Sequence, residues 1–260
     1  MENVLIVVAK EPLAGRTKTR LCPPFTAEGA AELYRCLMVD TLALAAGLPI
    51  ADRALAYTPA GARTYFAGLV PDGFRLVAQE GANLGERLAN ALRTHLELGY
   101  QRAVIMNSDG PTLPLSCLEE AFHALDTADV TLGPGHDGGY YLIGVKRLHP
   151  QLFQGIAWST EQVVPQTLAA CRRTGLRVHR LPEWYDVDVA GDLARLRADL
   201  ARDPSLAPCT AAFLSQTRFF AASPSPSLHS GQCDGVRSPA QPAGGSSRPG
   251  DCGQAGDNGR

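Results

Sequence analysis

The chain has 260 residues, of which 45% are hydrophobic and 19% charged, with a formal net charge of −2. These values are typical of one soluble globular domain or two small ones, and they argue against a strongly basic nucleic-acid binder. The apolar run 4–9 is too short to span a membrane and lacks the features of a secretory signal, so we expect a cytoplasmic protein. The seven cysteines form no C-x-x-C pair, which predicts reduced thiols and no thiolate zinc site.

The composition changes towards the C-terminus. Half of the forty positions between Ala221 and Arg260 are Gly, Pro or Ser, and none of the forty is aromatic. A segment of this composition cannot bury a hydrophobic core. We therefore predict one folded domain over residues 1–205 and a disordered tail over residues 206–260.

Short apolar runs predict the strands. The run 4–9 is nearly continuous and does not alternate with polar residues, as expected for a strand that is covered on both faces. Further strand-like segments follow at 53–58, 74–79, 102–107, 129–133, 140–145 and 176–181.

Helical patterns lie between most of these strands. Thr26 is placed to cap the first helix, Asn83 begins a second with a capping box, a third opens at Ser159, and the last covers about 189–203. Alternating strands and helices predict a three-layer α/β/α sandwich, Rossmann-like, around a mostly parallel central sheet. Ligands of such sheets bind beyond the carboxyl ends of the strands, so the loops there are candidates for function.

The loop after the first strand is rich in basic residues. It reads KEPLAGRTKTRL and holds two of the three lysines in the chain. Glycine allows the backbone to approach a ligand, and cationic side chains neutralise phosphate oxygens. Neither the P-loop nor the G-x-G-x-x-G pattern is present. The loop favours phosphate binding over a merely solvated basic turn, and its candidate residues are Lys10, Gly15, Arg16, Lys18 and Arg20.

A second candidate, Asp109, follows the apolar strand 102–107 within the segment MNSDGPTLP. Gly110 and Pro111 turn the chain sharply, so the carboxylate is presented at the end of a buried strand. Magnesium and manganese prefer such oxygen ligands, and substrate phosphates usually complete their coordination. An Asx-turn, in which the aspartate bonds its own backbone, is an equally good interpretation of this segment alone.

The segment LGPGHDGGYYLIGV, residues 132–145, joins two predicted strands. Its paired glycines form either a tight hairpin turn or a surface on which a ligand lies against the backbone. Asp137 is a candidate to bind an acceptor hydroxyl or act as a base. We expect His136 to be an ordinary surface histidine. The segment 158–160, which reads WST, either flanks an acceptor or packs beside a helix cap.

The segment EWYDVDVAGDL, residues 183–193, places Asp186 and Asp188 just before the last helix. In an extended segment the two carboxylates share a face, which offers a second metal ligand. Asp188 also stands where a helix N-cap is expected, and the two roles are compatible.

These motifs, in this order and at these separations, resemble the small bacterial glycosyltransferase-A-fold proteins. The most similar group is that of the radical-SAM/selenodomain-associated transferases, or arsenosugar-biosynthesis glycosyltransferases, and the resemblance spans about residues 3–200. It implies the nucleotide-diphospho-sugar-transferase fold, shared with molybdenum-cofactor guanylyltransferases, phospholactate guanylyltransferases and sugar-nucleotide synthetases.

The resemblance also implies roles for individual residues. In these proteins the basic loop grips nucleotide phosphates, which maps onto Gly15, Arg16, Lys18 and Arg20. The strand-end aspartate, here Asp109, holds a divalent cation (Mg or Mn), and Asp188 takes the place of a second ligand. The family commonly continues with Thr-Pro-Glu after that aspartate, where this chain has Val-Ala-Gly. The family also commonly carries Glu at the position of His136.

Three functions fit these residues. The first is a metal-dependent glycosyltransferase that moves a sugar from a nucleotide sugar to a small-molecule acceptor, with Asp109 and Asp137 as its catalytic residues. The second is a guanylyltransferase-like nucleotidyltransferase that releases pyrophosphate from an NTP, favoured by the crowded basic loop. The third is a non-catalytic nucleotide-binding module. The family naming favours the first.

Overall fold

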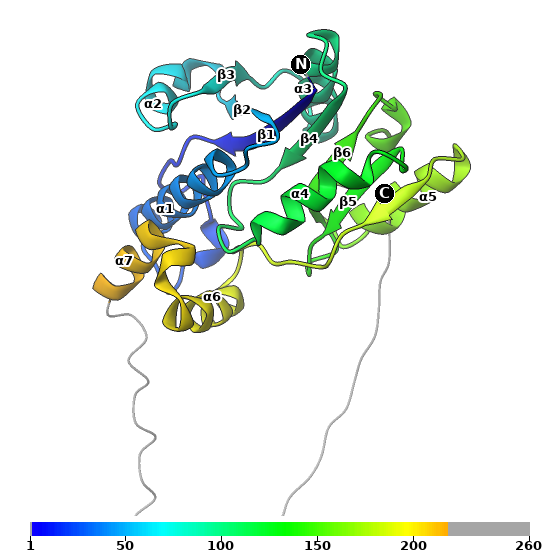
Figure 1. The fold of residues 1–260 in the computed structure, drawn as a ribbon. Coiled ribbons are helices and arrows are strands. Elements are labelled where there is room, and N and C mark those ends of the chain that lie inside the picture. The colour runs from blue at the N-terminus through cyan, green and yellow to red at the C-terminus, as the bar shows by residue number, and fades with distance from the viewer. Residues whose placement is uncertain (1, 218–260) are drawn as a thin grey trace, which may run out of the picture. The chain divides into compact units, whose positions relative to one another are not determined.

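The computed structural model describes residues 2–217. Its centre is a seven-stranded sheet in the order β3-β2-β1-β4-β6-β5-β7 (Figure 1). Only β6 runs antiparallel to its neighbours β4 and β5 among the paired strands of the described chain, so the predicted mostly parallel sheet is confirmed. The strands are β1 (Asn3–Lys10), β2 (Asp52–Thr58), β3 (Phe74–Ala78), β4 (Arg102–Met106), β5 (Val130–Pro134), β6 (Tyr140–Val145) and β7 (Val178–Arg180).

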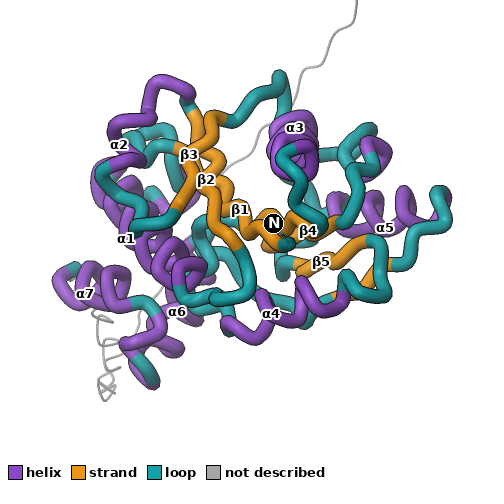
Figure 2. The backbone as a smooth tube through the Cα atoms, turned by 45° about the horizontal axis from the view of Figure 1, so that its top comes forward, coloured by secondary structure: helices purple, strands orange, loops and turns teal. Residues whose placement is uncertain are grey.

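Helices cover both faces of the sheet, as the sandwich architecture requires (Figure 2). Helices α1, α2 and α4 pack on one face, and α3 and α5 pack on the other. The helices are α1 (Ala27–Ala46), α2 (Arg63–Ala67), α3 (Leu84–Glu97), α4 (Leu115–Ala124), α5 (Val163–Arg173), α6 (Ala190–Arg202) and α7 (Pro208–Gln216). The ranges predicted from sequence omit α2, α4 and α7. In the part of the chain that the structure describes, no helix is both long and apolar enough to cross a membrane.

Strand β1 explains why the first apolar run does not alternate. Leu5 and Val7 belong to the core under α1 and α4, whereas Val4 and Ile6 belong to the core under α3 and α5. Because successive side chains of a strand point to opposite faces, a strand buried between two helical layers must be apolar at every position.

Two predicted helix starts are confirmed by their caps. Thr26 Oγ1 accepts a hydrogen bond from Gly29 N at 3.1 Å, and Asn83 Oδ1 accepts one from Glu86 N at 3.0 Å. The predicted start at Ser159 is wrong, because Ser159 adopts a left-handed backbone with φ of 64° and α5 begins only at Val163.

The outer face of α1 packs against α6 and α7 in a third cluster of buried residues. Asp40 of α1 joins the contact, since its two carboxylate oxygens accept from Cys209 N at 3.0 Å and Thr210 N at 2.8 Å at the start of α7. The predicted tail boundary at residue 206 therefore falls too early, because α7 packs against α1 and α6. The rest of the predicted tail, residues 218–260, lies outside the described residues.

Candidate active site

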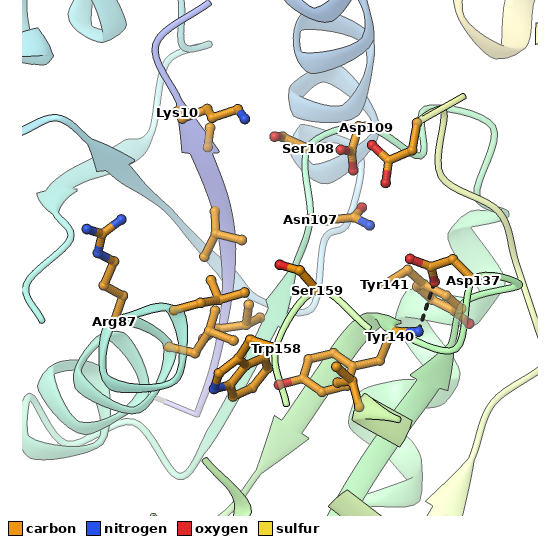
Figure 3. A pocket seen from close by; sticks show the side chains of 18 of the residues that line it. Lys10, Arg87, Asn107, Ser108, Asp109, Asp137, Tyr140, Tyr141, Trp158 and Ser159 are labelled. Atoms are coloured by element: carbon orange, nitrogen blue, oxygen red, sulfur yellow. Dashed lines mark hydrogen bonds between the residues drawn. The ribbon is translucent and has the colours of Figure 1, made fainter. Parts of the chain in front are cut away.

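A cavity of about 720 Å³ opens where the parallel strands end (Figure 3). The carboxyl ends of the first four strands form one part of its wall, through Lys10, Thr58, Gln79 and Asn107. The loop before β6 and the segment 158–163 before α5 form the opposite part. The cavity thus lies at the sheet edge where ligands of α/β proteins bind.

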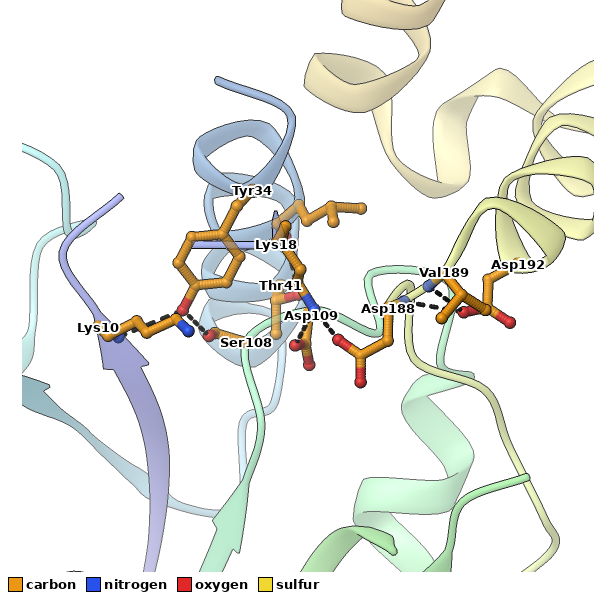
Figure 4. A network of polar contacts seen from close by, with 10 residues as sticks. Lys10, Lys18, Tyr34, Thr41, Ser108, Asp109, Asp188, Val189 and Asp192 are labelled. Carbon is orange, nitrogen blue, oxygen red and sulfur yellow. Dashed lines mark hydrogen bonds and ion pairs between the residues drawn. The ribbon is translucent and has the colours of Figure 1, made fainter. Parts of the chain in front are cut away.

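Lys18 links the first loop to two acidic segments that line this cavity (Figure 4). Its ammonium lies 2.5 Å from Asp109 Oδ2 and 2.6 Å from Asp188 Oδ1, and its side chain is only 5% exposed. The backbone of Lys18 is left-handed, with φ of 51°, so the loop turns there and directs the side chain inwards. Three motifs that are far apart in the sequence therefore meet at one point.

Asp109 is held at this point by the backbone. It follows β4, and its carbonyl oxygen accepts a hydrogen bond from Val187 N at 3.2 Å, which fixes the two acidic segments side by side. Oδ2 of Asp109 is paired with Lys18, and the buried Oδ1 has no hydrogen-bond partner within the described residues. The Asx-turn interpretation of Asp109 is therefore wrong.

Asp188 does not cap the last helix. The carboxylate of Asp192, in the first turn of α6, accepts hydrogen bonds from Asp188 N and Val189 N, both at 2.8 Å. Val189 is the N-cap residue of α6, and the carboxylate of Asp188 pairs with Lys18. The Val-Ala-Gly sequence after Asp188 does not turn this carboxylate away from the cavity.

Tyr34 of α1 packs beside the Lys18 ammonium. Its hydroxyl contacts Ser108 Oγ at 2.7 Å and accepts from Lys10 N at 3.2 Å, while its ring centroid lies 5.7 Å from the Lys18 ammonium. Burial and the charge of Asp109 raise the pKa of Tyr34 to about 12, so the hydroxyl stays protonated at neutral pH. Sequence analysis misses Tyr34 because it stands among the apolar positions of a helix.

The electrostatics of the three carboxylates and the lysine are linked. Burial alone would lower the pKa of Lys18, but the charges of Asp109 and Asp188 outweigh it and raise that pKa above its usual range. Burial tends to raise the pKa of Asp188, yet the charge of Lys18 prevails and lowers it. Asp186, buried beside Asp109, has a strongly raised pKa because of burial and that neighbouring charge.

The donor set fits a divalent cation that is shared with a ligand. Asp109 and Asp188 direct oxygens to one point, where the Lys18 ammonium now lies, and Asp109 Oδ1 has no hydrogen-bond partner within the described residues. Within residues 2–217 no three His, Cys, Asp or Glu side chains are grouped to hold a metal by themselves. Water and substrate phosphates commonly complete the coordination of Mg²⁺. The two aspartates suit such a cation when Lys18 moves its ammonium away.

The other residues of the basic loop differ in their placement. Lys10, Arg16 and Arg20 line the cavity with exposed side chains. Gly15 is exposed with φ of 72° and is not among the lining residues. Its left-handed conformation turns the loop, so the structure places it as a turn residue rather than in the cavity wall.

Asp137 lies across the cavity from the basic loop (Figure 3). Its Oδ1 accepts from Gly139 N at 2.9 Å, so the predicted turn is present, and the side chain still faces the cavity. His136 is exposed and its Nδ1 lies 2.8 Å from Nη1 of Arg195 on α6, outside the cavity lining. The structure thus brings Asp137, but not His136, to the site.

The segment 158–160 lines the same side of the cavity. The Trp158 ring meets the ring of Tyr140 edge to face, with centroids 6.2 Å apart.

Gln79 and Arg87, which sequence analysis does not single out, line the side near β3 and α3. The Nε2 group of Gln79 donates to Ala9 O at 3.2 Å and Ala56 O at 2.7 Å, which fixes its orientation. The position of Gln79 directly after a strand is the sequence signal that could have identified it as a candidate site residue.

The fold and this arrangement define a class that comparison with solved structures identifies. A crystal structure from Desulfovibrio desulfuricans G20, provisionally described as a nucleotide-diphospho-sugar transferase, is 34% identical, with a TM-score of 0.78 over 83% of this chain and 95% of that chain. The chain therefore belongs to the nucleotide-diphospho-sugar transferase superfamily, a class of transferases, as the sequence motifs predict.

Within that class, residues 41–160 match the family model described as "Uncharacterized protein conserved in bacteria (DUF2064)". No curated protein matches the chain.

Two more distant structures share the fold. CMP:2-keto-3-deoxy-manno-octonic acid synthetase complexed with CTP is 11% identical, with a TM-score of 0.52 over 78% of this chain and 100% of that chain. The 4-diphosphocytidyl-2C-methyl-D-erythritol synthase from Anaerococcus prevotii DSM 20548 is 8% identical, with a TM-score of 0.53 over 77% and 97%.

Proposed function

We propose that this protein is a metal-dependent glycosyltransferase that transfers a sugar from a nucleotide-diphosphate sugar to a small-molecule acceptor. The observation that carries the proposal is the meeting of Lys18, Asp109 and Asp188 in a cavity that Lys10, Arg16 and Arg20 also line. The description of the 34% identical protein as a nucleotide-diphospho-sugar transferase supports the choice of donor.

The basic residues bind the diphosphate in this proposal. Exposed cations at Lys10, Arg16 and Arg20 surround the cavity mouth, and Lys18 provides a fourth charge from within. Charge-assisted hydrogen bonds from these groups stabilise the negative charge that builds up on the departing phosphate oxygens. Gly15 turns the loop that carries them. No protein nucleophile is required.

Asp109 and Asp188 hold the divalent cation, Mg²⁺ or Mn²⁺. When bound, this cation supplies additional charge stabilisation to the diphosphate leaving group. Lys18 then binds the phosphate oxygens instead of the carboxylates. It thus neutralises Asp109 and Asp188 when no ligand is bound, and the phosphates of the donor when the nucleotide sugar is bound.

Asp137 binds and deprotonates the acceptor in this proposal. It lies on the opposite side of the cavity, and its backbone hydrogen bond orients the carboxylate while leaving Oδ2 available. A carboxylate there accepts the proton of an acceptor hydroxyl as that oxygen attacks the sugar. The adjacent Trp158 and Tyr140 rings provide an apolar surface for the acceptor or the sugar.

A nucleotidyltransferase is the competing function, because the five cationic side chains that line the cavity also suit a triphosphate. The two reactions release different products. Purified protein with Mn²⁺ is incubated with nucleotide sugars and, separately, with NTPs, and nucleoside diphosphate, free sugar and pyrophosphate are quantified. Nucleoside diphosphate release from a nucleotide sugar, lost in Asp109→Asn, supports the proposal. Pyrophosphate release from an NTP without sugar release overturns it.

A second experiment tests the alternative of a non-catalytic nucleotide-binding module. Calorimetry measures nucleotide binding by the wild type, by Asp109→Ala and in EDTA. Binding that is unchanged in all three, together with no turnover, identifies a module without metal chemistry. The placement of Asp188 towards Lys18 supports a working site instead, because the altered sequence after Asp188 does not displace its carboxylate.

A further inference from the structure

A pair of thiols lies at the contact between α1 and α7, away from the cavity. Cys36 is buried in α1, and Cys209 is partly exposed in the first turn of α7. Both sulfurs approach one atom, Nη2 of Arg35, at 3.6 Å for Cys36 and 4.0 Å for Cys209. The two sulfurs thus share one neighbouring guanidinium nitrogen. Neither cysteine lines the cavity.

The backbone holds this pair together. Asp40 follows Cys36 by one helical turn and therefore shares its face of α1. Asp40 Oδ1 accepts from Cys209 N at 3.0 Å, which places the start of α7 directly against that face. The approach of the two sulfurs thus results from a buried, hydrogen-bonded helix contact rather than from the chance position of two exposed side chains.

The surroundings of the pair favour oxidation at Cys209 first. Cys209 is the more exposed of the two, whereas Cys36 is covered. The guanidinium of Arg35 is partly exposed and lies within 4.0 Å of both sulfurs. Glu32, bound to Arg35 at 2.7 Å, fixes the guanidinium in place.

We propose that Cys36 and Cys209 form an oxidisable dithiol that hydrogen peroxide converts into a disulfide between α1 and α7. The sulfur of Cys209 attacks one peroxide oxygen, the O–O bond breaks, and a sulfenic acid and one water form. The sulfur of Cys36 then attacks that sulfur, and the S–O bond breaks while the Cys36 proton leaves with the oxygen as a second water. The two thiols lose two electrons, and one hydrogen peroxide becomes two waters.

The disulfide ties the C-terminal helix of the described chain to α1. Cross-linking positions this far apart in sequence restricts the unfolded chain, so the oxidised protein is more stable than the reduced one. The modification does not depend on the proposed transferase activity, because its residues lie outside the cavity. The outcome of the test for the disulfide is therefore independent of the function proposed for the cavity.

The test uses the full chain, reduced and then treated with a small excess of hydrogen peroxide. Peptide mapping without reduction is expected to find a Cys36–Cys209 cross-link with the loss of two hydrogen atoms. The thermal midpoint of unfolding is expected to rise by roughly 5 °C and to fall back after dithiothreitol. Recovery of both cysteines as separate thiols or as sulfinic acids, or a cross-link of Cys209 to Cys233 or Cys252, overturns the proposal.

Two variants provide the controls. Cys209→Ser, which changes only sulfur to oxygen, is expected to lose both the cross-link and the rise in the unfolding midpoint. Cys22→Ser removes another partly exposed thiol, whose sulfur contacts Thr26 O at 3.4 Å, and is expected to retain both effects. An equal rise in the Cys209→Ser protein contradicts the assignment.

Discussion

The Lys18 ammonium lies 2.5 Å from Oδ2 of Asp109, 91 positions later in the chain, and both residues line the cavity. The same ammonium is 2.6 Å from Asp188. A lysine that is buried between two carboxylates has its charge fully compensated, so a ligand that recruits it must offer at least as much negative charge. A diphosphate meets that requirement.

Replacement of Lys18 by Ala is expected to weaken nucleotide binding by about 1.5–3 kcal/mol, the range for a charge-assisted contact. Calorimetry with a nucleoside diphosphate in Mn²⁺ measures the change. Lys146→Ala is the matched control, because Lys146 is the one lysine of the chain outside the basic loop and does not line the cavity. A loss in Lys18→Ala no larger than that in Lys146→Ala would remove Lys18 from the phosphate site.

The same substitution is expected to have the opposite effect on metal binding. Without nucleotide, Lys18→Ala should bind Mn²⁺ roughly tenfold more tightly or better, because the competing ammonium has gone from between the two carboxylates. Electron paramagnetic resonance of free Mn²⁺ reports the affinity. Asp109→Asn should bind Mn²⁺ more weakly than the wild type. If Lys18→Ala leaves Mn²⁺ affinity unchanged, the lysine and the metal do not share a site.

Substitution of Asp137 by Asn distinguishes its role in the turn from its proposed role as the catalytic base. Asn keeps an oxygen that accepts from Gly139 N but loses the carboxylate charge, so Asp137→Asn should fold normally. If Asp137 is the base, kcat should fall by about 10²–10⁴-fold while KM for the donor changes little. Steady-state kinetics at several donor concentrations make the distinction. A kcat within threefold of the wild type would assign Asp137 to the turn alone.

The sequence predicts the sheet and most of its helices because their signals are local. The apolar run of β1 and the caps at Thr26 and Asn83 depend on neighbours within a few positions, and the structure confirms them. Helix α7 escapes prediction because the acceptor for its first N–H groups is Asp40, a residue 169 positions before Cys209. A local pattern cannot reveal a cap that the fold supplies from elsewhere.

In the candidate site, too, some features could be predicted from the sequence and others could not. The chain order of the motifs indicates a shared ligand, and the cavity brings Lys18, Asp109, Asp137 and Asp188 to one place. The sequence leaves open whether Asp188 caps α6, because only the folded backbone shows that Val189 takes the N-cap position and that Asp188 N donates to Asp192. The burial of Lys18 likewise depends on its left-handed conformation, which lysine rarely adopts and residue type does not predict.

The contact between α1 and α7 can be tested through Asp40. Asp40→Ala removes the acceptors of two backbone N–H groups and should lower the free energy of unfolding by about 1–2 kcal/mol, the cost of a lost helix cap. Asp40→Asn, which keeps one acceptor oxygen, should lose less. Urea denaturation measures both against Asp72→Ala, an exposed acid. Equal stabilities of Asp40→Ala and Asp72→Ala would show that the cap contributes nothing.

His95 is expected to make stability depend on pH. It is fully buried in α3, its Nδ1 lies 2.8 Å from Ala91 O, and its Nε2 has no hydrogen-bond partner within the described residues. Burial lowers the pKa of His95 below its usual value of 6.5, although the bond to Ala91 opposes the shift. The unfolded chain therefore binds the proton first on acidification. The stabilisation is complete above pH 6.5 and is lost as the pH falls through the folded-state pKa.

His95→Phe replaces the ring by one that takes no proton and should flatten this dependence. Between pH 6.5 and 5, the free energy of unfolding of the wild type should fall more steeply than that of the variant, by up to about 1.4 kcal/mol per pH unit. Urea denaturation at several pH values gives both slopes. His123→Ala, at an exposed histidine, should keep the slope of the wild type. Parallel curves for the wild type and His95→Phe would mean that His95 is protonated as readily in the folded protein as in the unfolded chain.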